Sequence, residues 1–243
     1  MTINFKDQRV LVTGGTRGIG YEIAKQFLDA DAQVVVTGTS MHKTENIDTR
    51  LYYEQLVIDK EQDWQESVKK IVDSYDGFDI LINNAGINKV NKIFETNVQD
   101  IEEILLTNLT APIFIVAEVS KKMKERKKGY IVNIGSIFGV VSKTGRNPYT
   151  ASKAGLIGVT KTMAIDLGED NVLVNCISPG FVDTQLTRAV LGEKAMSEIS
   201  SSIPMKRLAG VSDIAPTVLF MCSKYNSYIT GQNIIVDGGF TLE

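Results

Sequence analysis

A tyrosine and a lysine four positions apart, Tyr149 and Lys153, form the pair in this sequence best suited to proton transfer. They open a predicted helix, and residues four apart lie on one helix face. A free tyrosine has a pKa of about 10, too high for a base near neutrality. A lysine ammonium at ~4 Å would favour the phenolate by about 4 kcal/mol at an effective dielectric near 20. We therefore expect Lys153 to lower the pKa of Tyr149 to about 7.

Ser136 stands 13 positions before Tyr149, directly after a predicted strand at 131–134. Carbonyl reduction needs an acid that protonates the developing alkoxide and a donor that holds the carbonyl oxygen. Tyr149 fits the first role and Ser136 the second. A turn serine and a packed aromatic would explain each residue singly. Their joint spacing instead predicts hydride transfer to a carbonyl, with Tyr149 as the proton donor.

Asn108 is the fourth predicted catalytic residue. Pro112 cannot donate a hydrogen bond to the backbone carbonyl of Asn108, four positions earlier. We expect a helix kink there and a free carbonyl that could hold a water. Such a water beside Lys153 could pass a proton from bulk solvent to Tyr149. A helix bend without function is the alternative.

A glycine-rich turn near the N-terminus predicts a dinucleotide site. Residues 13–20 read TGGTRGIG and join a predicted strand to a predicted helix. Glycines bring backbone N–H groups close to a pyrophosphate, and the helix N-terminus adds partial positive charge. A glycine-rich turn without a ligand is the alternative. The predicted cofactor contacts in this loop are Gly14, Thr16, Arg17, Gly18, Ile19 and Gly20.

The end of the second predicted strand indicates which dinucleotide binds. An NAD site normally has a carboxylate there for the ribose 2′-hydroxyl. This sequence has Thr39 and Ser40 at that point, with Arg17 and Lys43 nearby and no acidic residue from position 32 to 44. Hydroxyl donors and positive charge suit a 2′-phosphate. We therefore predict NADP(H) rather than NAD.

Short apolar runs alternate with longer helical patterns along the chain, which is typical of an α/β fold with a parallel, doubly wound (Rossmann-type) sheet. We predict one domain over 1–243, with about seven strands and helices on both faces. Residues 184–210 interrupt the alternation and are predicted to form a substrate lid. Strands are expected near 10–12, 34–36, 56–58, 80–82, 131–134, 172–177 and 234–236, and helices near 18–29, 61–75, 98–127, 149–168 and 212–223.

Composition excludes several classes of function. The net charge is −3, so no overall basic field recruits nucleic acid. Cys176 and Cys222 lie in apolar surroundings and are expected to be buried thiols; with the single His42 they cannot build a metal site. The basic run at 121–128 is interpreted as a solvated helix end, with an anionic partner as the alternative. No signal peptide or apolar stretch of membrane-spanning length is visible, so we expect a cytoplasmic protein without a membrane partner.

Taken together, these residues resemble the short-chain dehydrogenase/reductase family, most closely bacterial 3-oxoacyl-[acyl-carrier-protein] reductases. The shared motifs span nearly the whole chain: the 13–20 loop, NNAG at 83–86, Asn108, Ser136, Tyr149, Lys153, and Pro179-Gly180 with Thr184. The resemblance implies that Asp59 contacts the adenine and that Asn84, Ala85 and Gly86 line the adenosine ribose. It also implies that Pro179, Gly180, Val182 and Thr184 bind the nicotinamide carboxamide, with Tyr149 and Lys153 beside the nicotinamide ribose. A homotetramer is implied, with the helices near 98–127 and 149–168 pairing across one interface.

The sequence departs from such reductases where they place basic residues for an acidic acyl carrier protein. Tyr130 and Asp170 stand at those positions, which weakens the expected docking surface unless the run at 121–128 compensates. Reduction of a 3-oxoacyl thioester to the 3-hydroxyacyl product, as in fatty acid biosynthesis, is the favoured interpretation. A reductase for a sugar, polyol or other biosynthetic ketone is the second. A non-catalytic NADPH-binding module is the third, against which the intact Asn108, Ser136, Tyr149 and Lys153 argue.

Overall fold

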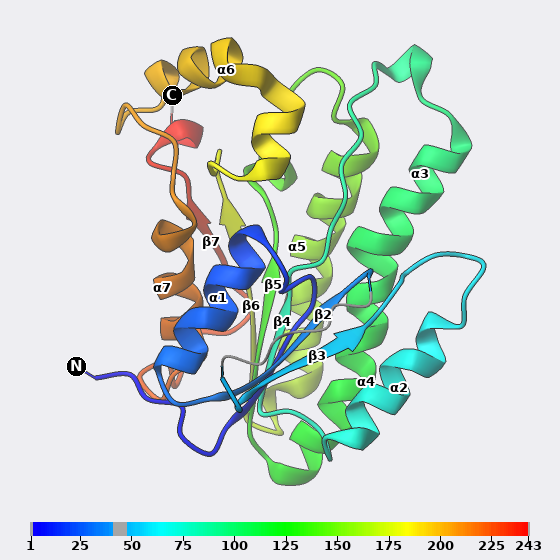
Figure 1. Ribbon diagram of the computed structural model, residues 1–243, viewed down its shortest axis with the longest axis vertical. Coiled ribbons are helices and arrows are strands. Elements are labelled where there is room, and N and C mark those ends of the chain that lie inside the picture. Colours follow the sequence, from blue (N-terminus) through cyan, green and yellow to red (C-terminus); the bar gives the residue numbers. More distant parts are fainter. Residues whose placement is uncertain (1, 41–47, 243) are drawn as a thin grey trace.

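The computed structural model describes residues 2–40 and 48–242, and for 186 and 189–194 only the backbone. Its strands form one parallel sheet in the order β3-β2-β1-β4-β5-β6-β7, with helices on both faces (Figure 1). This confirms the predicted doubly wound fold. The strands are β1 Arg9–Val12, β2 Gln33–Gly38, β3 Leu51–Gln55, β4 Ile80–Asn83, β5 Gly129–Ile134, β6 Val172–Pro179 and β7 Asn233–Val236.

Two helical layers cover the sheet. Helices α1 and α7 pack on one face, where Phe27 and Val218 join the core below β1 and β2. Helices α2, α4 and α5 cover the other face, as Figure 1 shows. The helices are α1 Gly18–Asp29, α2 Trp64–Ser74, α3 Val98–Leu105, α4 Ala111–Arg126, α5 Asn147–Gly168, α6 Gln185–Ser202 and α7 Val211–Met221.

β1 and β4 are neighbours in the sheet, and successive strands are added on opposite sides of this pair. From β1 the chain continues to β2 and β3 on one side, and from β4 to β5, β6 and β7 on the other. The loops at the carboxyl ends of β1 and β4 therefore diverge. Ligands of open α/β sheets bind at this kind of switch point.

The third strand differs from the prediction. We expected it at 56–58, whereas β3 covers Leu51–Gln55. It lies at the sheet edge and pairs only with β2, so its residues are exposed or half-buried and lack the apolar run of a central strand. Leu56 is buried directly after the strand, and its N–H donates to the Gly38 carbonyl at 2.9 Å.

The helical segment Val98–Arg126 corrects a second expectation. By length and composition alone it could cross a membrane, contrary to our reading of the sequence. Half of its most apolar window is buried inside the protein, where Ile115, Val119 and Met123 join the core on the α2, α4 and α5 side. Packing against the sheet therefore accounts for its apolar character.

Candidate active site

The glycine-rich loop between β1 and α1 is held against the end of β4. The Asn84 side-chain amide donates to the carbonyls of Thr13 at 3.0 Å and Gly14 at 2.9 Å. The Thr13 hydroxyl in turn accepts the backbone N–H groups of Asn84 and Ala85, at 3.0 and 3.1 Å. These bonds join the two loops that diverge at the switch point into one surface.

Glycine is required at several positions of this loop. Gly14 and Gly18 have φ of +62° and +58°, which L side chains rarely adopt. A Cβ at Gly20 would lie 2.3 Å from the Asn84 amide nitrogen and 2.5 Å from the Gly14 carbonyl oxygen. The glycines therefore let the loop turn tightly and pack against Asn84 at the N-terminus of α1, a suitable place for a pyrophosphate.

The predicted 2′-phosphate residues lie at the end of β2. Thr39 and Ser40 are exposed and directly follow Gly38. The Thr39 carbonyl accepts from the Gln55 side chain at 3.1 Å, and the Ser40 carbonyl accepts from the Tyr53 hydroxyl. Arg17 is exposed in the neighbouring loop, as the N-cap residue of α1. Lys43 and His42, both named from the sequence, lie outside the described residues.

The remaining predicted cofactor residues follow the ends of other strands. Asp59 accepts the backbone N–H groups of Glu61 and Gln62 at 3.0 and 2.8 Å, so its carboxylate orders the turn before α2. Gly180 directly follows β6, where a Cβ would lie 2.7 Å from the Asp237 side chain. Thr184 caps α6 by accepting the Thr187 N–H at 3.2 Å.

Thr184 also lies beside the glycine-rich loop. Its methyl carbon lies 3.8 Å from where a Cβ of Gly18 would be, which places the β6 loop beside the glycine-rich loop. Val182 forms an isolated bridge with Ala209. Thus Gly14, Gly18, Asn84, Gly180 and Thr184 share the carboxyl edge of the sheet, and their role in cofactor binding stays a prediction. The segment predicted as a lid forms α6, and its closing role stays a prediction.

Ser136 and Tyr149 come together from a strand end and a helix start. Ser136 directly follows Gly135 at the end of β5 and caps a 3-10 turn, Ile137–Gly139, by accepting the Phe138 N–H at 3.2 Å. Tyr149 lies in the first turn of α5. Burial raises the pKa of the Tyr149 hydroxyl, and the neighbouring Ser136 hydroxyl partly offsets this effect. The two side chains therefore lie at one site.

Lys153 is buried beside this pair, with 4% of its surface exposed. Its ammonium donates to the carbonyl oxygen of Ile134 at 2.8 Å and lies 5.8 Å from the centre of the Tyr149 ring. Burial lowers the pKa of Lys153 to about 8, against a weaker raising effect from Cys176. The lysine is thus fixed by the end of β5, one helical turn from the tyrosine.

The pKa of Tyr149 departs from our expectation. We expected Lys153 to lower it, but burial of the hydroxyl dominates and raises the pKa above 10. The opposing effects come from Ser136 and then from the charge of Arg146. The physical reason is the arrangement of Lys153, whose ammonium bonds to a backbone carbonyl rather than to the tyrosine. The protein alone therefore keeps Tyr149 protonated, the form that donates a proton.

Asn108 is fully buried, and its side chain binds the loop after β4. It accepts the Ile87 N–H and donates to the Ile87 carbonyl, both at 2.8 Å, and it contacts the Ser152 hydroxyl at 3.2 Å. The helix around it forms a π-helical turn, Leu106–Thr110, where we predicted a kink. Pro112 has no N–H to donate to the Asn108 carbonyl, so the regular α-helical bond is missing there. A π-helical turn is likewise wider than the bonding pattern of an α-helix. A Cβ at Gly86 would lie 3.3 Å from Asn108 Oδ1 and 3.6 Å from Lys153 Nζ, so all three share one site.

Three further residues lie beside this group, of which Phe138 and Arg146 were not identified from the sequence. Phe138 and Phe181 are buried with their ring centres 5.8 Å apart, and Phe138 lies 6.4 Å from the Tyr149 ring. Arg146 is the N-cap residue of α5, with its guanidinium carbon 5.3 Å from the centre of the Phe138 ring. A basic residue at a helix N-terminus is unfavourable, and this was the signal in the sequence that could have revealed it.

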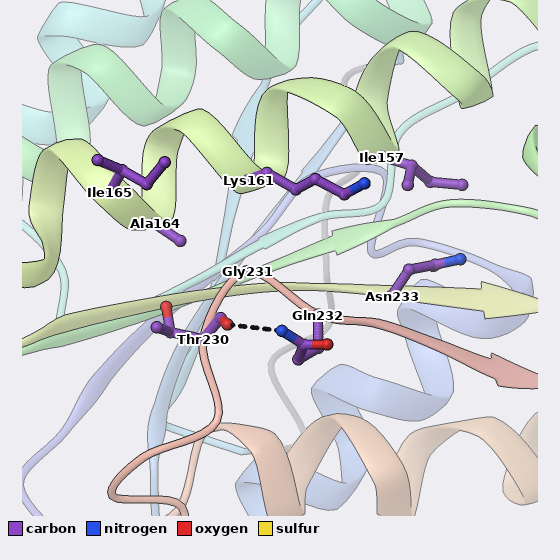
Figure 2. A pocket seen from close by; sticks show the side chains of 8 residues that line it. All are labelled: Ile157, Lys161, Ala164, Ile165, Thr230, Gly231, Gln232 and Asn233. Carbon is purple, nitrogen blue, oxygen red and sulfur yellow. Dashed lines mark hydrogen bonds between the residues drawn. The ribbon is translucent and has the colours of Figure 1, made fainter.

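A separate hollow of about 610 Å³ lies between α5 and the start of β7 (Figure 2). Lys161, Ile165 and Gln232 are among the side chains that face it. It contains none of the predicted catalytic or cofactor residues. We therefore assign the reaction to the carboxyl edge of the sheet and not to this hollow.

Comparison with known proteins agrees with this geometry. A family model described as enoyl-(acyl carrier protein) reductase matches residues 14–241. The 3-oxoacyl-[acyl-carrier-protein] reductase of Aquifex aeolicus is 37% identical over 247 residues, covering 98% of this chain and 99% of its own. The solved structure of ElxO with NADP bound has a TM-score of 0.89 at 30% identity, covering 97% of this chain and 99% of its own. The gluconate 5-dehydrogenase of Burkholderia cenocepacia, in complex with NADP and tartrate, has a TM-score of 0.92 at 25% identity, covering 100% and 98%.

Proposed function

The chain belongs to the short-chain dehydrogenase/reductase family, and on that premise we propose that it reduces a 3-oxoacyl thioester to the 3-hydroxyacyl product with NADPH. The convergence of Ser136, Tyr149 and Lys153 at the carboxyl edge of the sheet carries this proposal. Similarity to 3-oxoacyl-[acyl-carrier-protein] reductases supports the choice of substrate. It is an oxidoreductase that acts on C=O and CH–OH groups.

NADP(H) is the cofactor, and the residues present fit it. Gly14 and Gly18 give the loop its positive φ values, and the absence of a side chain at Gly20 lets the loop pack against Asn84, so the backbone at the N-terminus of α1 can approach a pyrophosphate. Arg17, Thr39 and Ser40 would hold the 2′-phosphate. Asp59, Asn84, Ala85 and Gly86 would line the adenosine, and Pro179, Gly180, Val182 and Thr184 the nicotinamide. When bound, NADPH supplies the hydride.

The chain's own residues hold the carbonyl and supply the proton. Ser136 would donate a hydrogen bond to the carbonyl oxygen and stabilise the charge that develops there. Tyr149, kept protonated by burial, would donate its hydroxyl proton to that oxygen. Ser136 and the charge of Arg146, which both lower the pKa of Tyr149, would stabilise the phenolate that remains. Lys153, held by Ile134, would bind the nicotinamide ribose. Asn108 orders the loop at Ile87 beside Lys153, where a water could return the proton.

Within one chain, the basic run at 121–128 lies too far from the active site to serve as a docking surface for an acyl carrier protein. It lies at the end of α4 that leads into β5, whereas Ser136 follows the opposite end of β5 (Figure 1). Lys124 and Lys127 form ion pairs with the buried Asp170, and Arg126 pairs with Asp76. This observation favours the second candidate, a reductase of a sugar, polyol or other small ketone that needs no carrier.

We also propose a homotetramer in which α4 and α5 pair across one interface. Ile113 on α4 and Ile165 on α5 expose 38% and 78% of their surface, and apolar side chains of that kind suit a contact between copies. Light scattering on the purified protein should give four times the chain mass of 26.7 kDa. A monomeric mass would contradict this proposal.

Turnover of neutral thioesters tests the proposed function. With NADPH, we expect reduction of the acetoacetyl thioester of N-acetylcysteamine, and a loss in kcat of about 10²-fold or more for Tyr149→Phe. NADPH affinity, measured by fluorescence, should stay nearly unchanged in that variant. Turnover of keto-sugars but not of thioesters would transfer the assignment to the second candidate. Binding of NADPH without turnover of any ketone would support a non-catalytic module.

A further inference from the structure

Arg146 is a buried cation that has no anionic partner among the described side chains. Only 6% of its surface is exposed, and arginines are almost never buried to that degree unless they are paired. In the described part of the chain its guanidinium has no hydrogen bond and no ion pair, and its one specific contact is with the Phe138 ring. Burial accordingly lowers the pKa of Arg146, and no carboxylate raises it. A charge left unpaired in such a place is unfavourable.

Its place in the fold adds to this cost. Arg146 is the N-cap residue of α5, a helix of 22 residues, and its side chain makes no capping hydrogen bond. The first N–H groups of a helix carry partial positive charge, which disfavours a cation and attracts an anion. A buried guanidinium and the start of a long helix therefore place positive charge at one point, and no described side chain supplies a negative charge to balance it.

This point adjoins the reacting groups. Arg146 precedes Tyr149 by three positions on α5, and its charge lowers the pKa of the Tyr149 hydroxyl. Both side chains contact Phe138, with Arg146 at 5.3 Å from the ring centre and the Tyr149 ring at 6.4 Å. Phe181 packs against Phe138, and the Lys143 ammonium lies 5.9 Å from the Phe181 ring centre. Two cations thus flank an aromatic cluster beside the proton donor.

We propose that Arg146 binds a carboxylate of the substrate, so that the preferred substrate is a carbonyl compound with a carboxylate a few bonds from the reacting C=O. A planar guanidinium can donate two parallel hydrogen bonds to a carboxylate, which fixes the orientation of the substrate as well as holding it. Phe138 and Phe181 would pack against the carbon chain. This inference rests on the proposed carbonyl reductase activity and names its substrate class. The carboxylate belongs either to a free oxo acid or to the far end of an oxoacyl thioester.

Pairs of substrates that differ only in charge test the proposal. The free-acid probes are 3-oxobutanoate and 4-oxopentanoate, each compared with its methyl ester. The thioester probe is the N-acetylcysteamine thioester of 3-oxoadipate, compared with the same compound carrying a methyl ester at its far end. With NADPH, we expect kcat/KM for at least one acid to exceed that of its ester by about tenfold or more. The pair with the larger ratio identifies the source of the carboxylate.

Arg146→Gln should abolish this ratio, because kcat/KM for the acid should fall about tenfold more than kcat/KM for its ester, whatever change the lost charge causes in both through Tyr149. Arg146→Lys keeps the positive charge but cannot donate two parallel hydrogen bonds, so it should retain part of the preference for the acid over its ester. Lys143→Gln is the matched control, because it removes an exposed cation beside the same aromatic cluster; it should leave most of the ratio. The pH profile and the melting temperature are measured for each variant.

Several results would overturn the inference. Equal losses for acid and ester in Arg146→Gln, with a shifted pH profile, would show that Arg146 acts on Tyr149 and not on the substrate. Equal losses with a lower melting temperature or a smaller oligomer would show a structural role. Esters reduced as well as acids by the wild type would also refute it, yet leave the proposed reductase intact. Reduction of no ketone at all would instead refute the proposed function.

Discussion

The ammonium of Lys153 donates a hydrogen bond to the carbonyl oxygen of Ile134, with 2.8 Å between nitrogen and oxygen. This bond fixes a buried cation at the end of β5, where burial lowers the pKa of Lys153 to about 8 from an ordinary value of 10.5. The folded protein therefore holds the charge less readily than the unfolded chain does. A residue that serves the reaction in this way reduces the stability of the fold.

Lys153→Met should abolish turnover and stabilise the fold near neutral pH. The lowered pKa corresponds to a few kcal/mol, from which the lost bond to Ile134 subtracts about 1 kcal/mol. We expect the free energy of unfolding at pH 7 to rise on the order of 2 kcal/mol in chemical denaturation. Lys70→Met, exposed on α2 and outside the proposed interface, is the control and should change it by no more than about 0.5 kcal/mol.

The gain from Lys153→Met should depend on pH in a defined direction. Below about pH 8, Lys153 is charged in both the folded and the unfolded chain, so its cost is fully present. From about pH 8 to pH 10.5 the folded state loses the proton first, and wild-type stability rises relative to the variant. The difference between the two proteins should therefore shrink by pH 10. A difference that stays constant or grows would show that the charge of Lys153 is not the cause.

Gly20→Ala should impair both cofactor binding and stability. The new methyl group would lie 2.3 Å from the Asn84 amide nitrogen and 2.5 Å from the Gly14 carbonyl, so the bonds between the two loops must break or shift. We expect a destabilisation of about 1–3 kcal/mol and at least about tenfold weaker NADPH binding by fluorescence titration. Gly168→Ala at the end of α5 is the matched control: no atom lies within 4 Å of the new carbon, and the free energy of unfolding should change by no more than about 0.5 kcal/mol.

The preference for NADPH should depend on Thr39. The wild type should prefer NADPH over NADH in kcat/KM by at least about tenfold. Thr39→Asp places a carboxylate at the exposed end of β2, where it would repel a 2′-phosphate and accept a hydrogen bond from a ribose 2′-hydroxyl. In steady-state kinetics of this variant, the ratio of kcat/KM for NADPH to kcat/KM for NADH should fall. Equal use of both cofactors by the wild type would contradict the assignment of Arg17, Thr39 and Ser40.

The central strands and the glycine-rich loop could be predicted from the sequence. Gly14 and Gly18 could be placed because their backbone has a positive φ, and Gly20 because a side chain there would collide with Asn84. The edge strand β3 was misplaced because an exposed edge lacks the apolar run that marks central strands. The pKa of Tyr149 could not be predicted, because it depends on how deeply the hydroxyl is buried and on which atom Lys153 contacts. Both are properties of three-dimensional packing that spacing along the chain does not contain.

The last prediction concerns an acyl carrier protein, whose acidic surface needs a basic rim beside the active site. In this chain Lys121 and Lys122 lie near the opposite end of the sheet, where they form ion pairs with Glu118 and Glu125. Changing both lysines to Gln should therefore leave kcat/KM for a carrier-bound 3-oxoacyl substrate within about twofold of the wild type. Steering by charge weakens as the Debye length falls from about 10 Å at 0.1 M salt to about 3 Å at 1 M. We accordingly expect the ratio of carrier-bound to coenzyme A-bound turnover to be insensitive to salt. A large carrier advantage that salt abolishes, and that the double variant also loses, would establish these lysines as the docking site, reached through a neighbouring copy of the chain.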